Sequence, residues 1–287
     1  MRILVTGSAG QLGRDVVRAA ERAGHDVTGY AHGELDITDP DALDRAFDAD
    51  RSEAVVNCAA YTDVDGAEAD PNAAMEVNAI GAGRVAAAAR RASARVVHVS
   101  SDYVFDGRRR QPYLEEDEAN PLSAYGRSKL TGEHAVAETC RDHAIVRSSW
   151  LFGLGGHNFV ETMLRLAGDR DEVAVVTDQL GCPTWTGHLA GALVEICAGP
   201  SRGLYHVAAD GECSWHAFAL EIFRQAGVEC TVRERLTADL ARPAPRPEYS
   251  VLRSGRSDAP RLPHWVDGLS AYLTQRAGAS DEPGSPA

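Results

Sequence analysis

The sequence of 287 residues predicts an α/β protein in which a doubly wound parallel sheet carries a smaller, mixed α/β lobe. Two observations support this fold class. Up to Trp150, short apolar strand patterns alternate with helical patterns whose length suits the crossovers of a parallel sheet. Beyond Trp150 the apolar runs become shorter and less regular, which indicates a second lobe that is built differently from the first.

The elements of the parallel sheet follow one another from the first residues. The segment RILVT (2–6) is an apolar strand that leads into a glycine, and residues 11–23 have the spacing of a helix that stops at Gly24. Such strands are apolar throughout because helices cover both faces of the sheet. The further elements expected are strands at 26–31, 54–60, 94–101 and 144–150, and helices that begin at 39, run over 71–92 and carry Tyr125.

The second lobe is predicted from shorter patterns. Strands are expected at 172–177 and 203–208. A helix is expected within 213–227, with Ser214 as its N-cap and Gly227 as its C-terminal stop. The segment RPAPRPEYSVL (242–252) is interrupted by proline and cannot form a continuous helix.

The composition argues against several classes of partner. A net charge of −13 and an isoelectric point near 5.2 disfavour nucleic acid and anionic membrane surfaces. No apolar run reaches the ~18 residues of a membrane span, and the N-terminal segment lacks a signal-peptide pattern. The six cysteines show neither a CxxC motif nor a metal-binding spacing with histidine. We therefore expect a cytoplasmic protein with reduced cysteines.

A glycine-rich loop follows the first strand. The segment VTGSAGQLG places Gly7, Gly10 and Gly13 between strand and helix in the spacing G-x-x-G-x-x-G. Glycines there permit a tight turn and a close approach of the backbone to a pyrophosphate, while the helix N-terminus supplies N–H donors. The loop therefore predicts a Rossmann-type dinucleotide-binding domain.

The domain boundaries follow from this loop and from the change of pattern after Trp150. A substrate-binding lobe is expected to complete the molecule, and the C-terminal end has the composition of a disordered tail. The boundaries are 1–148 for the dinucleotide-binding domain, to which 170–198 return, 149–169 and 199–275 for the substrate-binding lobe, and 276–287 for the tail.

The choice between NADPH and NADH depends on the end of the second strand. An acid there suits the ribose of NADH, and an arginine suits the 2′-phosphate of NADPH. The strand ends Gly29-Tyr30-Ala31-His32, with neither. Asp36 and Ile37, which follow, either meet the adenine end of the cofactor or, in the case of Asp36, cap the next turn. NADPH is favoured and NADH stays open.

Tyr125 and Lys129 form a Y-x-x-x-K pair, and Lys129 is the only lysine of the chain. Four residues apart on a helix, the two side chains lie on one face. A nearby ammonium favours the phenolate, so the pair predicts a lowered pKa for Tyr125 and a role in proton transfer. Ser101, in VHVSSDYVFDG, ends a strand at the rim where open α/β sheets bind ligands. Together the three residues predict a catalytic set that acts on a substrate oxygen.

A series of segments is similar to one family. The series GSAGQLG, NCAAYTDVDGAE, VHVSSDYVFDG, PLSAYGRSKLTGE, VRSSWLFG, NFVETMLRLA, DQLGCPT and GLYHVAADGECSWHAFA spans most of residues 3–220. In these segments the chain resembles the dTDP-4-dehydrorhamnose reductases of the extended short-chain dehydrogenase/reductase superfamily. The resemblance implies that a nicotinamide cofactor reduces the C4 ketone of a nucleotide sugar, dTDP-4-dehydro-L-rhamnose. Tyr125 would give the proton, Lys129 would tune Tyr125, and Ser101, where the family normally has threonine, would steady the oxygen.

The resemblance also implies which residues line the two ligand sites. For the cofactor these are Gly7, Gly10, Gln11, Leu12, Gly13, Asp36, Ile37, Ala59, Ala60, Tyr61, Tyr125 and Lys129. For the substrate they are Ser101, Asp102, Tyr103, Trp150 and Asn158. Packing between the lobes is the alternative role for Trp150, and His206 and Trp215 are expected to be structural.

Some relatives form metal-bridged dimers through glutamates. Asp15 and His188 stand at those places here, so no metal ligand is assigned and a requirement for Mg²⁺ is left open. The chain is expected to be a monomer or a homodimer.

Three other functions are alternatives for a chain with these motifs. A 4,6-dehydratase of the superfamily resembles the pattern T-D-E, whereas this chain has Ser101-Asp102-Tyr103 and lacks the second acid. A reductase of another nucleotide-linked 4-keto-6-deoxysugar stays open. A non-catalytic regulatory subunit is disfavoured by the intact set of Ser101, Tyr125 and Lys129.

Overall fold

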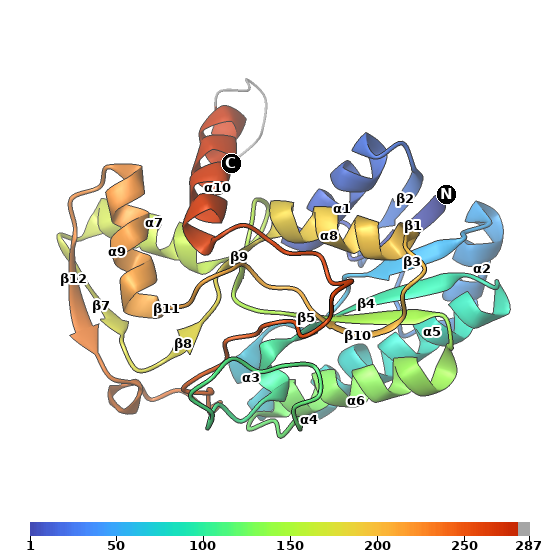
Figure 1. The fold of residues 1–287 in the computed structure, drawn as a ribbon, viewed down its shortest axis with the longest axis horizontal. Helices are drawn as coiled ribbons and strands as arrows, with labels where there is room; N and C mark the ends of the chain where they lie inside the picture. Colours follow the sequence, from blue (N-terminus) through green and yellow to red (C-terminus); the bar gives the residue numbers. More distant parts are fainter. Residues whose placement is uncertain (281–287) are drawn as a thin grey trace.

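The computed structural model describes residues 1–280, and six strands of this part form one parallel sheet (Figure 1). The strand order is β10-β5-β4-β3-β1-β2, and all neighbours in it are parallel. From β1 the chain goes first to β2 on one side and then to β3 on the other, so the strand order reverses at β1. Ligands bind at such a switch point in open α/β sheets. The predicted doubly wound sheet is confirmed. Its strands are β1 (Arg2–Thr6), β2 (Asp26–Tyr30), β3 (Ala54–Asn57), β4 (Arg95–Ser101), β5 (His143–Ser148) and β10 (Gly203–His206).

Helices cover both faces of this sheet (Figure 1). One face packs against α1 (Gln11–Arg22) and α8 (Thr186–Ala198). The other packs against α2 (Pro40–Asp50), α5 (Ala82–Arg91) and α6 (Ala124–Thr139). No helix among residues 1–280 combines the length and apolar character that a membrane span requires.

The helix expected over 71–92 is present, but it changes its pitch on the way. It consists of α4 (Pro71–Met75), a π-helical turn η1 (Glu76–Gly81) and α5. A short helix, α3 (Val64–Ala69), precedes it. Single π-helical turns inside α-helices are often found at functional sites.

A second core lies beside the sheet, at the left of Figure 1, and is rich in aromatic side chains. Phe152, Phe218 and Tyr272 meet in it, with ring centroids 5.5 and 5.4 Å from that of Phe152. The elements of the smaller lobe around this core are β6 (Leu151–Phe152), α7 (Phe159–Asp169), β7 (Glu172–Val176), β8 (Leu180–Gly181), β9 (Thr184–Trp185), β11 (Cys213–Ser214), α9 (Trp215–Ala226), β12 (Thr231–Arg235) and α10 (Trp265–Ser280).

The caps predicted for α9 are confirmed. The Ser214 side chain accepts a hydrogen bond from the backbone N–H of Ala217 at 3.1 Å, and Gly227 ends the helix with φ of 64°. Both signals are local, since a cap acts within one turn of the residue that provides it. They could therefore be identified without knowledge of the tertiary contacts.

The predicted domain boundaries need corrections. β10 lies within 199–275 but pairs with β5, because its apolar residues complete the main sheet after the crossover through α8. β7 lies within 170–198 but pairs with β12 in the smaller lobe. Of the predicted tail 276–287, residues 276–280 are helical in α10, and 281–287 lie outside the described residues.

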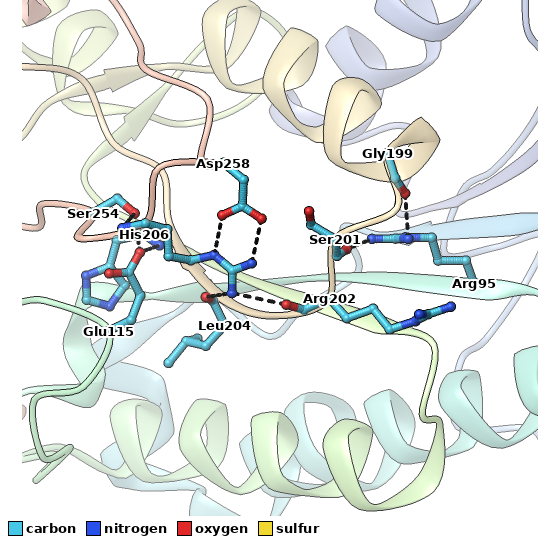
Figure 2. A network of polar contacts seen from close by, with 10 residues as sticks. Arg95, Glu115, Gly199, Ser201, Arg202, Leu204, His206, Ser254 and Asp258 are labelled. Carbon is cyan, nitrogen blue, oxygen red and sulfur yellow. Dashed lines mark hydrogen bonds and ion pairs between the residues drawn. The ribbon is translucent and has the colours of Figure 1, made fainter.

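The C-terminal segment fastens the edge strand β10 to the molecule (Figure 2). The Arg256 guanidinium forms two hydrogen bonds of 2.8 Å with Asp258 and donates to the carbonyls of Arg202 and Leu204. It also lies 3.9 Å from the ring centroid of Tyr205. An uncovered edge strand invites pairing with another chain, and this contact covers β10.

Candidate active site

The glycine-rich loop has the close contacts that its sequence predicts. Gly7 has φ of 67°, and a Cβ there would lie 2.9 Å from the backbone of Ala59. A Cβ on Gly13 would lie 2.2 Å from the carbonyl oxygen of Gly7, so α1 can approach β1 this closely only with glycine. The N-cap of α1 is Gly10, which offers no side chain to the free N–H groups of the first turn. This cradle of bare backbone donors fits the pyrophosphate of a dinucleotide.

The two residues after the loop differ in what they offer. Leu12 is buried in the core, so only its backbone faces the loop. The Gln11 amide donates to the carbonyl of His157 at 2.9 Å, and its oxygen accepts from Asn158 at 3.4 Å. Gln11 therefore connects the start of α1 with the smaller lobe.

Asp36 caps the turn that follows it. One oxygen of its carboxylate accepts from both the N–H and the hydroxyl of Thr38, each at 2.8 Å. These hydrogen bonds hold the pKa of Asp36 below its usual value. Ile37 is 3% exposed and packs in the core. Of the two roles considered for Asp36, the structure shows the cap.

Ala59, Ala60 and Tyr61 follow β3 and are half-buried, and the backbone of Ala59 lies against Gly7 of the glycine-rich loop. A side chain that the sequence analysis missed, Asn78 of η1, holds this segment. Its amide accepts from the N–H of Tyr61 at 2.9 Å and donates to the carbonyl of Tyr61 at 3.0 Å and to Ser128 at 2.9 Å. Asn78 is a polar residue on the buried face of an alanine-rich helix, and this is the sequence feature that could have indicated its role.

Helix α6 packs at backbone distance against the turn that follows β4 and against η1. A Cβ on Gly126 would lie 2.2 Å from the carbonyl oxygen of Tyr103, and one on Gly132 would lie 2.0 Å from that of Asn78. The N-cap of α6 is Ser123, whose side chain accepts from the N–H of Gly126 at 3.1 Å. These contacts determine where along β4 the side chains of α6 are placed.

The structure brings Ser101, Tyr125 and Lys129 together. Ser101 ends β4 and forms a hydrogen bond with Tyr125. The Lys129 ammonium donates to the carbonyl of Val99, two residues earlier in β4, at 2.7 Å. The charge of Lys129 also acts on Cys58, which adjoins the glycine-rich loop. The predicted catalytic set therefore lies at the rim where the loop lies.

The predicted acidification of Tyr125 by Lys129 is not observed. Burial raises the pKa of Tyr125 to about 12, against the effect of its hydrogen bond with Ser101, and the charge of Asp102 raises it further. Burial also lowers the pKa of Lys129 to about 8, while Glu133 and Cys58 oppose this. The reason is that desolvation disfavours every charged form in this part of the molecule. Tyr125 is therefore a neutral phenol at neutral pH.

Asp102 and Tyr103 adjoin this set. Asp102 is 2% exposed and accepts from the Ser101 hydroxyl at 3.0 Å. Burial raises the pKa of Asp102 to about 7, although hydrogen bonds from Ser250 and Ser101 oppose it. The Tyr103 ring meets that of Tyr125 edge-on, with centroids 5.7 Å apart. Both predicted substrate residues therefore lie next to the phenol.

Trp150 and Asn158 are engaged in structural contacts. Trp150 has φ of 47° and stacks on Trp215 with a centroid distance of 3.5 Å, which is the packing between lobes considered for it. The Asn158 side chain caps α7, accepting from the N–H of Glu161 at 3.0 Å and donating to the carbonyl of Gly153 at 2.9 Å. The amide of Asn158 thus serves the helix cap, and Trp150 keeps an unusual backbone conformation beside the site.

Two arginines near Tyr103 were not identified from the sequence. Arg246 forms hydrogen bonds of 3.1 and 2.8 Å with Asp65, and only 10% of its side chain is exposed. Burial and the charge of Arg246 lower the pKa of Arg242, which shows that positive charge accumulates here. The sequence shows that both arginines belong to the proline-interrupted segment 242–252. No pattern within that segment indicates that it folds back to Tyr103.

Asp15 and His188, the residues at the family's metal positions, have other partners. The Asp15 carboxylate accepts from the Thr186 hydroxyl at 2.6 Å, and burial raises its pKa. His188 packs edge-on against Trp185 with centroids 4.7 Å apart. Within residues 1–280, no three histidine, cysteine or acidic side chains gather into a metal-binding group.

Comparison with known proteins identifies the family. The family model described as RmlD substrate binding domain matches residues 1–277. A dTDP-4-dehydrorhamnose reductase of Streptomyces griseus is 42% identical over 98% of this chain and 96% of its own. A dTDP-4-keto-6-deoxy-D-glucose reductase of Streptomyces niveus is 41% identical over 94% and 95%.

A solved structure agrees with this. It is that of dTDP-4-dehydrorhamnose reductase from Bacillus anthracis in complex with NADP, which is 36% identical with a TM-score of 0.93 and covers 96% of this chain and 99% of its own. Sequence, fold and the arrangement of Ser101, Tyr125 and Lys129 point the same way. The chain belongs to the dTDP-4-dehydrorhamnose reductase family.

Proposed function

We propose that this protein reduces the C4 ketone of dTDP-4-dehydro-L-rhamnose to dTDP-L-rhamnose with NADPH. The observation that carries the proposal is the meeting of Ser101, Tyr125 and Lys129 at the end of β4, beside the glycine-rich loop. The similarity to reductases of this substrate over nearly the whole chain supports it. The relative crystallised with NADP supports NADPH as the cofactor.

The cofactor fits the glycine-rich loop. Gly7, Gly10 and Gly13 leave room for a pyrophosphate, and the first N–H groups of α1 supply its donors. The segment Ala59–Tyr61, held by Asn78, adjoins the same loop. A bound reduced nicotinamide supplies the hydride, because no amino-acid side chain can donate one.

The side chains at the end of β4 handle the proton. Tyr125, a phenol with a pKa of about 12, remains protonated and donates its proton to the alkoxide that forms at C4. The Lys129 ammonium stabilises the phenolate left behind, and the Ser101 hydroxyl steadies the substrate oxygen. Asp102 and Tyr103, which adjoin Tyr125, orient the sugar in this proposal, and the positive charge of Arg242 and Arg246 suits the diphosphate.

Replacement of Tyr125 by phenylalanine tests the proton-donor role. We expect kcat to fall by roughly 10² or more, since the ring is kept and the proton donor is lost. The assay is the loss of reduced-nicotinamide absorbance with dTDP-4-dehydro-L-rhamnose, with binding of NADPH measured separately as the control for folding. Unchanged turnover in the variant would contradict the assignment.

A reductase of another nucleotide-linked 4-keto-6-deoxysugar is the second candidate. The relative from Streptomyces niveus, named for a different keto-sugar, favours keeping it. The same assay with dTDP-4-keto-6-deoxy-D-glucose separates the two. Higher kcat/KM with that sugar would change the substrate and leave the chemistry of Tyr125 in place.

A further inference from the structure

The catalytic face of α6 continues beyond Lys129. Tyr125, Lys129 and Glu133 are spaced by four residues and therefore lie on one side of the helix. Three consecutive residues of β4 contact these three side chains. Ser101 contacts Tyr125, the Val99 carbonyl accepts from Lys129 at 2.7 Å, and the residue between them contacts Glu133.

Glu133 is held from two sides. Its Oε1 accepts from the Ser100 hydroxyl at 2.5 Å and from Arg147 Nε at 2.8 Å, and its Oε2 accepts from the second Arg147 nitrogen at 2.6 Å. Both side chains of this ion pair are 4% exposed. A carboxylate with bidentate arginine and hydroxyl partners has one fixed position. The mechanism proposed above does not use any of these three residues.

Arg147 also has contacts on the side away from Glu133. It lies 5.0 Å from the ring centroid of Phe105, and its NH1 approaches His206 Nε2 at 3.5 Å. The other nitrogen of His206 lies 3.0 Å from the carbonyl oxygen of Tyr113 and 3.1 Å from that of Arg253. His206, shown beside Glu115 in Figure 2, thereby connects the pair to the segment that covers β10.

Two groups near Lys129 favour the charged form of its side chain. Glu133 on its own helix and Cys58 at the end of β3 raise its pKa against the effect of burial, and Glu133 has the larger effect of the two. His98 of β4 also faces it, and burial and the charge of Lys129 strongly lower its pKa, so it is neutral and adds no positive charge. Tyr125, one turn earlier on α6, is neutral. Burial raises the pKa of Cys58 to about 12, so Cys58 is a neutral thiol, and the negative charge that acts on Lys129 is that of Glu133.

We propose that Glu133, fixed by Ser100 and Arg147, is a positioning residue that keeps the Lys129 ammonium charged and directed toward the catalytic end of β4. The proposal rests on the proposed function, because it assigns Lys129 the task of stabilising the Tyr125 phenolate. A neutral amine at this place would leave that phenolate without a counter-charge.

The single lysine of the chain makes a direct test possible. Lysine-selective ¹³C and ¹⁵N labelling of the full-length protein yields one side-chain signal, and its pH titration reports the ionisation of Lys129 without any turnover. The double variant Glu133→Gln/Arg147→Met removes both buried charges together and so leaves neither unpaired. Glu161→Gln, which loses an ion pair with Arg276 in the smaller lobe, is the matched control.

The wild-type signal is expected to titrate near pH 8. In the double variant the midpoint is expected to fall by about one unit, because Glu133 acts on Lys129 whereas Arg147 is not among the charges that shift its pKa, and the alkaline limb of kcat is expected to move with it. Ser100→Ala, a milder change, is expected to shift both in the same direction. An unmoved midpoint in variants that bind NADPH would overturn the role of Glu133. A shifted midpoint in a protein that reduces no keto-sugar would support the coupling and refute the proposed function alone.

Discussion

Burial governs the chemistry of the side chains around the end of β4. It raises the pKa of Tyr125 to about 12 and that of Asp102 to about 7, and it lowers that of Lys129 to about 8. Each shift favours the neutral form, as desolvation does. A site that delivers a proton to a developing alkoxide benefits from this, because its donor stays protonated over the working range of pH.

At the residue scale, Asp102→Asn is expected to stabilise the protein at neutral and alkaline pH. The folded carboxyl titrates near 7 and the unfolded one near 3.8, so the folded state binds more protons between these values. Stability of the wild type therefore falls as pH rises from 4 to 7, by up to about 4 kcal/mol, and asparagine avoids this loss. Thermal unfolding of both proteins at pH 4.5 and pH 8 measures it. An equal difference at the two pH values would argue against the shift.

At the scale of elements, glycine sets how closely helices approach the sheet. Gly13 lets α1 reach the turn at Gly7, and Gly126 and Gly132 let α6 touch the carbonyls of Tyr103 and Asn78. Because the obstacles are backbone atoms, they cannot rotate away as a flexible side chain would. The positions of the cofactor loop and of Tyr125 are thus consequences of missing Cβ atoms.

Two glycine-to-alanine substitutions separate this packing from helix propensity. Gly13→Ala is expected to destabilise the protein by more than about 2 kcal/mol and to weaken NADPH binding, because its Cβ meets the Gly7 carbonyl. Gly191→Ala, in α8 with no atom within 4 Å of its Cβ, is expected to stabilise by about 0.5–1 kcal/mol. Urea unfolding and NADPH titration measure both. Similar changes in stability at the two positions would show that helix propensity, and not the contact of the new Cβ, determines the effect.

At the scale of the whole molecule, a few aromatic and charged contacts join the smaller lobe to the sheet. Trp150, just after β5, stacks on Trp215 at the start of α9, and its indole also packs against Gly181. Arg246 of the C-terminal part pairs with Asp65 of α3 on the other side of the site. The relative position of the two lobes, and with it the shape of the substrate site, depends on these contacts.

Replacement of Trp215 by alanine tests this connection. We expect a loss of about 3 kcal/mol in unfolding free energy, since a stacked indole is removed, and a rise in KM for the nucleotide sugar. Denaturant unfolding and steady-state kinetics measure the two effects, with Leu220→Ala, an exposed position on the same helix, as control. A stability loss below 1 kcal/mol would mean that the stacking contributes little.

By itself the sequence determined the local and periodic features of this protein. Strand and helix patterns predicted the parallel sheet, the three glycines predicted the tight turn, and Ser214 and Gly227 marked the ends of α9. The Y-x-x-x-K spacing placed Tyr125 and Lys129 on one face of a helix. Each of these depends on neighbours within a few residues, so a linear pattern contains it.

Only the tertiary structure decided what depends on distant parts of the chain. It placed β10 in the main sheet and made Asp36 the cap of a turn. It brought Asn78 to Tyr61, and it reversed the expected shift in the pKa of Tyr125. Burial and hydrogen bonding between segments control these outcomes, because desolvation depends on everything that surrounds a group in space and not on its neighbours in sequence.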